Sequence, residues 1–128
     1  MIVFDSSAIF KMISLGKSSH LSAQHTSSLA FFEVGNMVWK NSVLTNIYSQ
    51  KEAIELLGVC EIVLEKMRIS YVEFKDIYHI AEKCHISFYD ASYVCLAKEL
   101  KCPFVTLDHK LALKIKPVVD ILAIEQIV

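Results

Sequence analysis

The sequence predicts an α/β fold built around a parallel sheet, and two features of its hydrophobic pattern support this. Short, mostly apolar runs occur at residues 2–4, 103–106 and 118–124. Continuous apolar runs of this kind are typical of strands that are buried on both faces. Between them lie longer segments whose apolar residues recur at helical spacing. Strands that alternate with helices indicate a parallel sheet covered by helices.

Helix start signals define the other elements. Asp5 closes the first strand, and the two serines that follow it precede a helix. Ser49 and Glu52 form a capping-box pattern that opens a long helix, and Ser87 with Asp90 opens another. The remaining expected elements are helices over residues 27–41, 72–84 and 108–115 and short strands over residues 21–25 and 67–71.

Two of these helices carry a recognisable apolar side. In the helix over residues 72–84, one side is formed by Phe74, Ile77, Tyr78 and Ala81. In the helix that opens near Asp90, apolar residues continue to the end of the segment. We therefore expect both helices to pack against the rest of the chain.

Length and composition indicate one domain over residues 1–128, without membrane spans. A chain of this length buries about two-thirds of the surface that its unfolded form exposes, and it contains no repeat or linker. No apolar run reaches the ~18 residues of a membrane span, and the N-terminus lacks the basic region of a signal peptide. The cysteines form no C-x-x-C pair and lie in apolar segments, which indicates core residues in a reducing, cytoplasmic compartment: Cys60, Cys84, Cys95 and Cys102.

Four acidic residues are candidate site residues, although each has an ordinary structural explanation. Asp5 and Asp108 follow strands and are suited to cap helices, and Asp90 is suited to a capping box with the serine before it. Glu33 lies within a mostly apolar helix, where an ionised carboxylate either reaches solvent or requires a cation. Asn36, one turn later, fits a solvated face. Taken singly, each acid leaves both interpretations open.

Taken together, the acids predict a metal site. Ligands of an open parallel sheet bind beyond the carboxyl ends of its strands, and the starts of the following helices lie at the same edge. Carboxylates that meet there repel one another unless a cation compensates their charge. Oxygen ligands favour Mg²⁺ or Mn²⁺, which bind through a few carboxylates together with substrate phosphate. The expected substrate is therefore a phosphodiester.

Other chemistries lack their sequence patterns. There is no G-x-x-x-x-G-K-[ST], G-x-G-x-x-G or G-x-S-x-G motif, and the chain contains only three glycines. The five histidines do not have the spacing of a zinc-binding helix pair. A net charge of −1 argues against nucleic-acid binding by bulk electrostatics alone, but it leaves local basic patches and contact through a metal open.

Four short motifs in order resemble the PIN-domain nucleases, and within them the small toxins of VapBC toxin–antitoxin pairs. The motifs are VFDSSA, LAFFEVGN, SFYDASYVCLAKEL and PFVTLDHKLA, and the resemblance covers nearly the whole chain. It implies a three-layer α/β/α sandwich with a central parallel sheet. It also implies Mg²⁺- or Mn²⁺-dependent cleavage of RNA by an acidic set with supporting polar residues: Asp5, Glu33, Asp90 and Asp108, supported by Ser7, Asn36 and Thr106.

The expected activity is that of an endoribonuclease in which a bound metal activates water. Asp5, Asp90 and Asp108 would hold the metal, and Glu33 would bind a second ion or act on the attacking water. The excess of apolar residues predicts exposed patches and a homodimer, and the resemblance adds an antitoxin partner that points a basic side chain at the carboxylates. The alternatives are a non-catalytic scaffold of the same fold and a housekeeping RNA-processing nuclease.

Overall fold

A four-stranded parallel sheet lies at the centre of this computed structural model, which describes residues 1–128. Each strand is only two residues long, and the order across the sheet is β3-β2-β1-β4. Val3 of the central strand β1 pairs with His25 on one side and Phe104 on the other. The sequence prediction of a parallel sheet is confirmed. The strands are β1 (Val3–Phe4), β2 (His25–Thr26), β3 (Arg68–Ile69) and β4 (Phe104–Val105).

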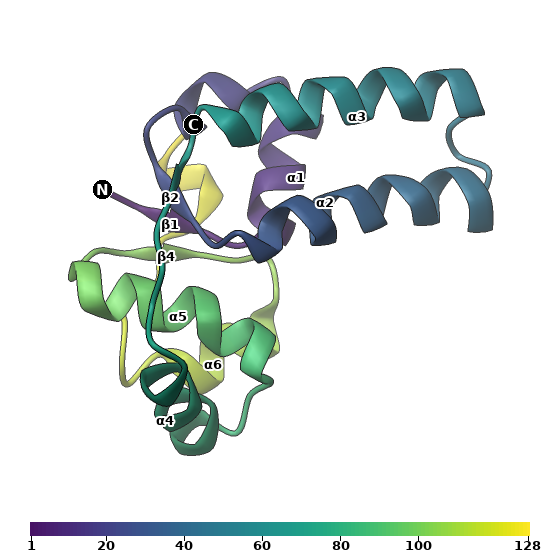
Figure 1. Cartoon of the computed structure of the whole chain (residues 1–128). Helices are drawn as coiled ribbons and strands as arrows, with labels where there is room; N and C mark the ends of the chain where they lie inside the picture. The colour runs from purple at the N-terminus through teal and green to yellow at the C-terminus, as the bar shows by residue number, and fades with distance from the viewer.

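Six α-helices surround the sheet and give the predicted three-layer arrangement. Figure 1 shows α4 and α5 on one side of the strands, with α1 and the end of α3 on the other. Both α1 and α5 contact β1, so the central strand is covered on both faces. The helices are α1 (Ser6–Ser14), α2 (Leu29–Trp39), α3 (Gln50–Glu65), α4 (Phe74–Cys84), α5 (Phe88–Leu100) and α6 (His109–Ile115).

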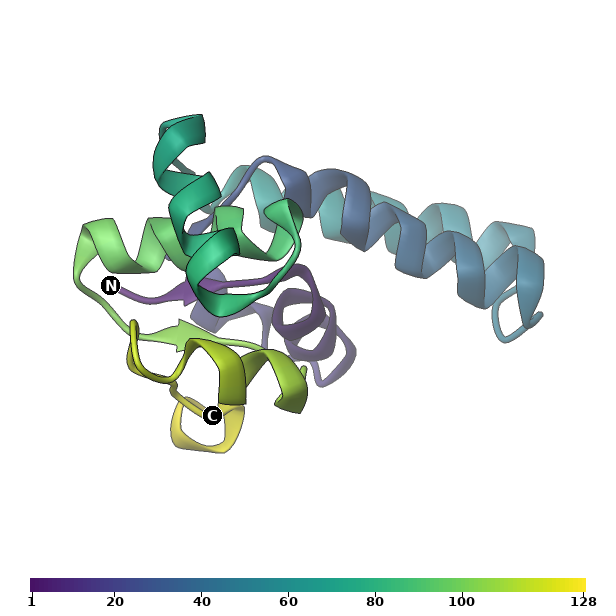
Figure 2. The ribbon, with the colours of Figure 1, turned by 90° about the horizontal axis from the view of Figure 1, so that it is seen from below.

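Helices α2 and α3 form a long hairpin that projects from the rest of the molecule (Figures 1 and 2). A π-helix, η2 (Lys40–Leu44), extends α2 beyond the expected end of the helix. The predicted capping box opens α3, because Ser49 Oγ accepts the N–H of Glu52 at 3.1 Å and the Glu52 carboxylate accepts the N–H of Ser49 at 3.0 Å. Helix α2 of this hairpin contacts α1.

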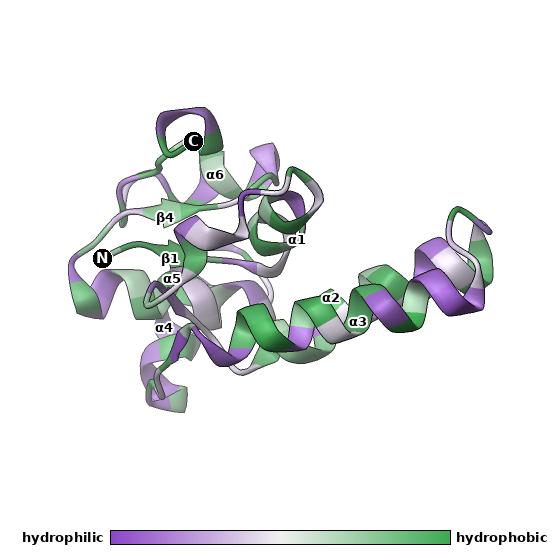
Figure 3. Cartoon of the chain, turned by 90° about the horizontal axis from the view of Figure 1, so that it is seen from above, coloured by the Kyte–Doolittle hydropathy of each residue, from purple (hydrophilic) through white to green (hydrophobic).

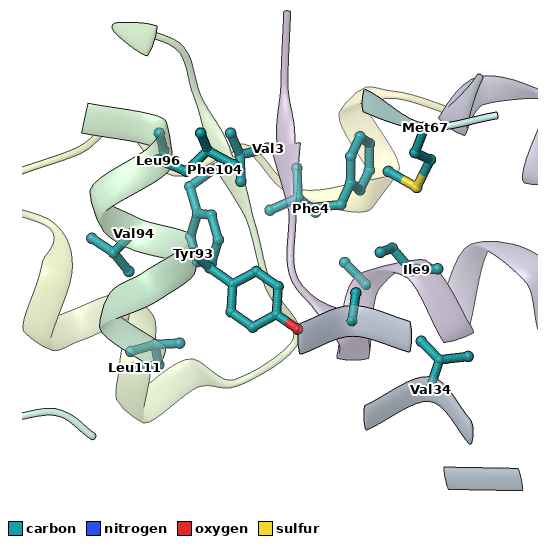
Figure 4. Packing of buried hydrophobic residues seen from close by; sticks show 14 of the residues in the cluster. Val3, Phe4, Ile9, Val34, Met67, Tyr93, Val94, Leu96, Phe104 and Leu111 are labelled. Carbon is teal, nitrogen blue, oxygen red and sulfur yellow. The ribbon is translucent and has the colours of Figure 1, made fainter. Parts of the chain in front are cut away.

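One cluster of 30 buried apolar residues joins the sheet to its helices. Phe4 and Phe104 are completely buried, and Tyr93 is 1% exposed (Figure 4). All four cysteines are free; three are buried and Cys102 is partly buried, as the sequence predicts. No helix combines the length and the apolar character needed to cross a membrane.

Two predicted strands are wrong in extent. The segment 21–25 enters the sheet only at His25, because residues before it form a 3₁₀ helix, η1 (Ser18–Leu21). Residues 118–124 make only an isolated bridge to Phe104 through Ile121, after which the chain turns into a second 3₁₀ helix, η3 (Ile124–Gln126). Phe104 provides both backbone hydrogen bonds of this bridge, so the pairing ends after a single residue.

The apolar side predicted for α4 is also only partly correct. Ile77, Ile80 and Cys84 are buried and form the side that packs on the core. Phe74 and Tyr78 are 66% and 55% exposed. An amphipathic pattern shows which residues share a helix face, but the position of α5 decides how much of that face is covered. The two aromatic side chains remain at the surface.

Candidate metal centre

The four candidate acids come from separate parts of the chain and collect near the carboxyl edge of the sheet. Asp5 immediately follows β1, and two residues separate Asp108 from the end of β4. Asp90 lies in the first turn of α5, and Glu33 lies within α2. Since β1 and β4 are parallel neighbours, the residues that follow them emerge at the same edge. The topology therefore brings together side chains that are far apart in the sequence.

Asp5 is held by a set of short hydrogen bonds. Its Oδ1 accepts the Ser7 hydroxyl at 2.6 Å and the Ala8 N–H at 2.9 Å, so the same carboxylate is the N-cap of α1. Burial raises the pKa of Asp5, while hydrogen bonds from Ser7, Thr106 and Ala8 oppose this shift by stabilising the charged form. The charge of Asp90 raises the pKa of Asp5 further.

The hydroxyls of Ser7 and Thr106 connect the first acid to the last. Ser7 Oγ accepts the N–H of Leu107 at 3.0 Å, and Thr106 Oγ1 accepts the N–H of Asp108 at 3.1 Å. Each hydroxyl also stabilises the charged form of Asp5 by hydrogen bonding. The loop from β4 to α6 is thus tied to the start of α1.

Asp90 and Asp108 lie at the starts of α5 and α6. Ser87 caps α5, since its hydroxyl accepts the N–H of Asp90 at 3.0 Å. Asp108 caps α6 through its Oδ1, which accepts the N–H of Leu111 at 3.0 Å. Burial raises the pKa of Asp90, and the negative charges of Glu33 and Asp108 raise it further. This electrostatic coupling shows that the acids share one environment.

Glu33 turns towards the protein, and two hydroxyls hold it there. Its Oε1 accepts the Ser6 hydroxyl at 3.0 Å and the Tyr93 hydroxyl at 2.6 Å. The other oxygen, Oε2, accepts no hydrogen bond and is open to solvent. Burial and the neighbouring Glu33 charge raise the pKa of Tyr93 far above its usual range, so the phenol remains protonated and continues to donate.

The sequence interpretation missed Ser6 and Tyr93 and gave Asn36 a role that no contact supports. Asn36 is exposed and makes no side-chain hydrogen bond in the structure. Tyr93 follows Asp90 by three residues on the same helix, and side chains at this spacing lie on one face. That spacing was the available signal, because it places a hydroxyl-bearing residue of a buried helix beside a candidate acid.

The donor set suits a hard divalent cation, although no group of three or more His, Cys, Asp or Glu side chains is arranged to hold a metal as it stands. All four candidate groups are carboxylates, whose oxygens Mg²⁺ and Mn²⁺ prefer. Mg²⁺ usually binds through one or two protein carboxylates, several waters and the phosphate of its substrate. An incomplete protein shell is therefore compatible with this chemistry.

Comparison with known proteins identifies the family. The family model of the PIN domain matches residues 2–115. Ribonuclease VapC3 from Pyrobaculum aerophilum is 35% identical over 92 residues, which cover 70% of either chain. The crystal structure of PAE2754 from Pyrobaculum aerophilum superposes with a TM-score of 0.82 over 98% of this chain and 90% of that one, at 20% identity. The chain belongs to the PIN-domain family. Its curated relative places it among the VapC-type members.

We expect Asp90→Asn to stabilise the metal-free protein at pH 7. The raised pKa means that the folded state holds more protons than the unfolded state above the usual pKa of 3.8. The free energy of unfolding therefore falls as the pH rises through this window. The neutral asparagine does not ionise, so the variant does not lose this stability. Solvent screening at this partly buried position limits the gain to about 1 kcal/mol, or a melting temperature roughly 2–6 °C higher.

Thermal unfolding in the presence of a chelator, from pH 4 to pH 8, measures this effect. Asp120→Asn is the matched control, because this aspartate is exposed and lies in the segment after α6. It should leave the melting temperature unchanged. A lower melting temperature for Asp90→Asn at pH 7 would contradict the predicted repulsion between the carboxylates.

Proposed function

We propose that this protein is a metal-dependent endoribonuclease, the toxin of a type II toxin–antitoxin pair. Its family and its relative named Ribonuclease VapC3 support a nuclease. The observation that carries the proposal is the position of the acids, since Asp5 and Asp108 follow the parallel neighbours β1 and β4 and Asp90 lies in the first turn of α5. The raised pKa values of Asp5 and Asp90, which burial and neighbouring acids cause, support it. Proteins rarely assemble such repulsion without a cation to offset it.

In the proposed mechanism, Asp5, Asp90 and Asp108 hold Mg²⁺ or Mn²⁺. Such an ion, when bound, acidifies a water for in-line attack on phosphorus and neutralises charge on the phosphate oxygens. Ser7 keeps Asp5 oriented through its 2.6 Å hydrogen bond. Glu33 offers its free Oε2 to the attacking water or to a second ion.

Basic side chains near the acids would guide the RNA backbone. Lys114 lies close enough to Asp90 to lower the pKa of that carboxyl group, and its ammonium donates to the carbonyl of His85 at 3.2 Å. Lys110 is exposed on the same short helix, and Lys11 is exposed on α1. Lys114 thus supplies positive charge beside Asp90 in a chain whose net charge is −1.

The antitoxin partner would cover the projecting hairpin and reach the acids. Figure 3 shows apolar segments along α2 and α3, where Phe32, Trp39 and Leu44 are 79%, 47% and 59% exposed. Phe32 precedes Glu33 on α2, so this apolar helix also carries a candidate acid. A peptide on the hairpin could therefore place an Arg or Lys against the carboxylates by charge complementarity. We place this pair in the cytoplasm, where the free cysteines stay reduced.

We also propose a homodimer through an aromatic patch formed by Tyr71, Phe74, Tyr78, Phe88 and Tyr89. These side chains are between 38% and 78% exposed, and the rings of Phe74 and Phe88 pack edge to face with centroids 5.2 Å apart. Aromatic residues of this size expose on the order of 600 Å² in total at such fractions. This approaches the ~800 Å² that each partner of a standard interface buries. The proposed partner is a second copy of the chain, because its own aromatic patch consists of the same uncharged side chains.

Cleavage of RNA in the presence of Mn²⁺ tests the proposed activity. The wild type should cleave single-stranded RNA, a chelator should abolish cleavage, and Asp90→Asn should lower the rate by roughly 100-fold because a metal ligand is lost. Asp120→Asn should cleave as the wild type does. Equal rates for the wild type and Asp90→Asn would refute the assignment and leave a scaffold of the same fold.

Light scattering after size exclusion tests the proposed dimer. The wild type should elute with twice the mass of one chain, and Phe74→Glu should elute as a monomer because a charge in an apolar interface is costly to bury. Leu113→Glu changes an exposed leucine on α6, outside the patch, and should remain dimeric. A monomeric wild type at high concentration, or a dimeric Phe74→Glu variant, would rule out this interface.

A further inference from the structure

Among the residues whose side chains donate hydrogen bonds to a candidate acid, Tyr93 is the most deeply buried. It is 1% exposed, and its ring packs in the core beside the central strand (Figure 4). Its hydroxyl donates to Glu33 Oε1 at 2.6 Å across a separation of 60 residues in the sequence. Tyr93 thus connects the hydrophobic core under α5 directly to a candidate acid on α2.

Core packing alone does not explain this hydroxyl. Phenylalanine would fill the same space without a polar atom, and burying a hydroxyl that lacks a partner is costly. The Tyr93 hydroxyl donates its proton to the Glu33 carboxylate, and the bond is short, as bonds to charged acceptors are. We therefore explain the presence of a hydroxyl at this position by the hydrogen bond that it donates to Glu33.

The same oxygen of Glu33 receives both donors. The Ser6 and Tyr93 hydroxyls both bond to Oε1, which leaves Oε2 without a partner. A Glu carboxylate otherwise rotates freely about its last torsion, because that torsion is broad. Two donors on one oxygen restrict this rotation, and Oε2 stays without a protein donor.

We propose that Tyr93 is a positioning residue that fixes Oε1 of Glu33 so that Oε2 faces a divalent cation and the attacking water. The inference rests on the proposed nuclease function. Displacements of about 1 Å in a catalytic group lower rates by roughly 100-fold, and the loss of an outer-shell hydrogen bond costs 10–100-fold in metal affinity or activity. Because Tyr93 is buried, it does not contact RNA, and its effect acts on Glu33 alone.

Tyr93→Phe tests this role with two readouts. We expect the Mn²⁺ concentration that gives half-maximal stabilisation in thermal unfolding to rise roughly tenfold. For RNA cleavage, we expect kcat to fall roughly tenfold while KM for RNA stays within about twofold. Tyr48→Phe is the matched control, since Tyr48 is partly buried in the connection between α2 and α3, away from the acids. It should match the wild type in both readouts.

The outcomes separate positioning from a purely structural role. A structural effect would lower the melting temperature equally with and without Mn²⁺ and leave the Mn²⁺ dependence unchanged, which would overturn the proposal. If Tyr93→Phe does not fold, Ser6→Ala is the second variant, because it removes the other donor to the same oxygen of Glu33. An unchanged Mn²⁺ dependence in Ser6→Ala would likewise overturn the proposal.

The first readout also distinguishes this inference from the proposed function. If the wild type binds Mn²⁺ but does not cleave RNA, a weaker Mn²⁺ response in Tyr93→Phe still supports positioning, while the nuclease assignment fails. If the wild type cleaves RNA and Tyr93→Phe matches it in kcat and Mn²⁺ dependence, positioning fails and the nuclease assignment stands. A wild type that does not respond to Mn²⁺ overturns both.

Discussion

Repulsion between carboxylates is the constraint on which this edge of the structure depends. The fold places Asp5, Glu33, Asp90 and Asp108, from four segments, near one edge of the sheet. Burial raises the pKa values of Asp5 and Asp90; the charge of Asp90 adds to the shift of Asp5, and the charges of Glu33 and Asp108 add to that of Asp90. In the absence of a cation, this arrangement reduces stability at neutral pH. The surrounding structure must therefore supply enough stabilisation to keep the acids in place. The binding of a divalent cation would account for an arrangement that lowers the stability of the metal-free protein.

Neutral donors provide this support, and several of them also build the fold. Asp5 and Asp108 each accept a backbone N–H at the start of a helix, so the capping and metal-binding interpretations are compatible. Glu33 is held instead by hydroxyls, one of them from the core residue Tyr93. The proposed site is thus connected to the helix starts and to the hydrophobic core. A substitution in either region would therefore alter the positions of the acids.

Local patterns made much of this structure predictable. The parallel sheet, the capping box at Ser49 and the approximate places of the helices follow from hydrophobic periodicity and cap residues. Tertiary packing decided the rest. The exposure of Phe74 and Tyr78 depends on how much of α4 is covered by α5, and the brief pairing of Ile121 depends on a single residue of β4. The spacing of Tyr93 from Asp90 could place Tyr93 beside an acid, but its contact with Glu33 spans two helices, so no local pattern could assign that partner.

We propose that Asp5, Asp90 and Asp108 hold a divalent cation between the ends of β1 and β4. Crystals soaked in Mn²⁺ and measured for anomalous scattering test this most directly. We expect a peak within metal–oxygen bonding distance, about 2.0–2.3 Å, of carboxylate oxygens from Asp5 and at least one of Asp90 and Asp108. A map without a peak there at saturating Mn²⁺, or with a peak elsewhere only, would contradict the account.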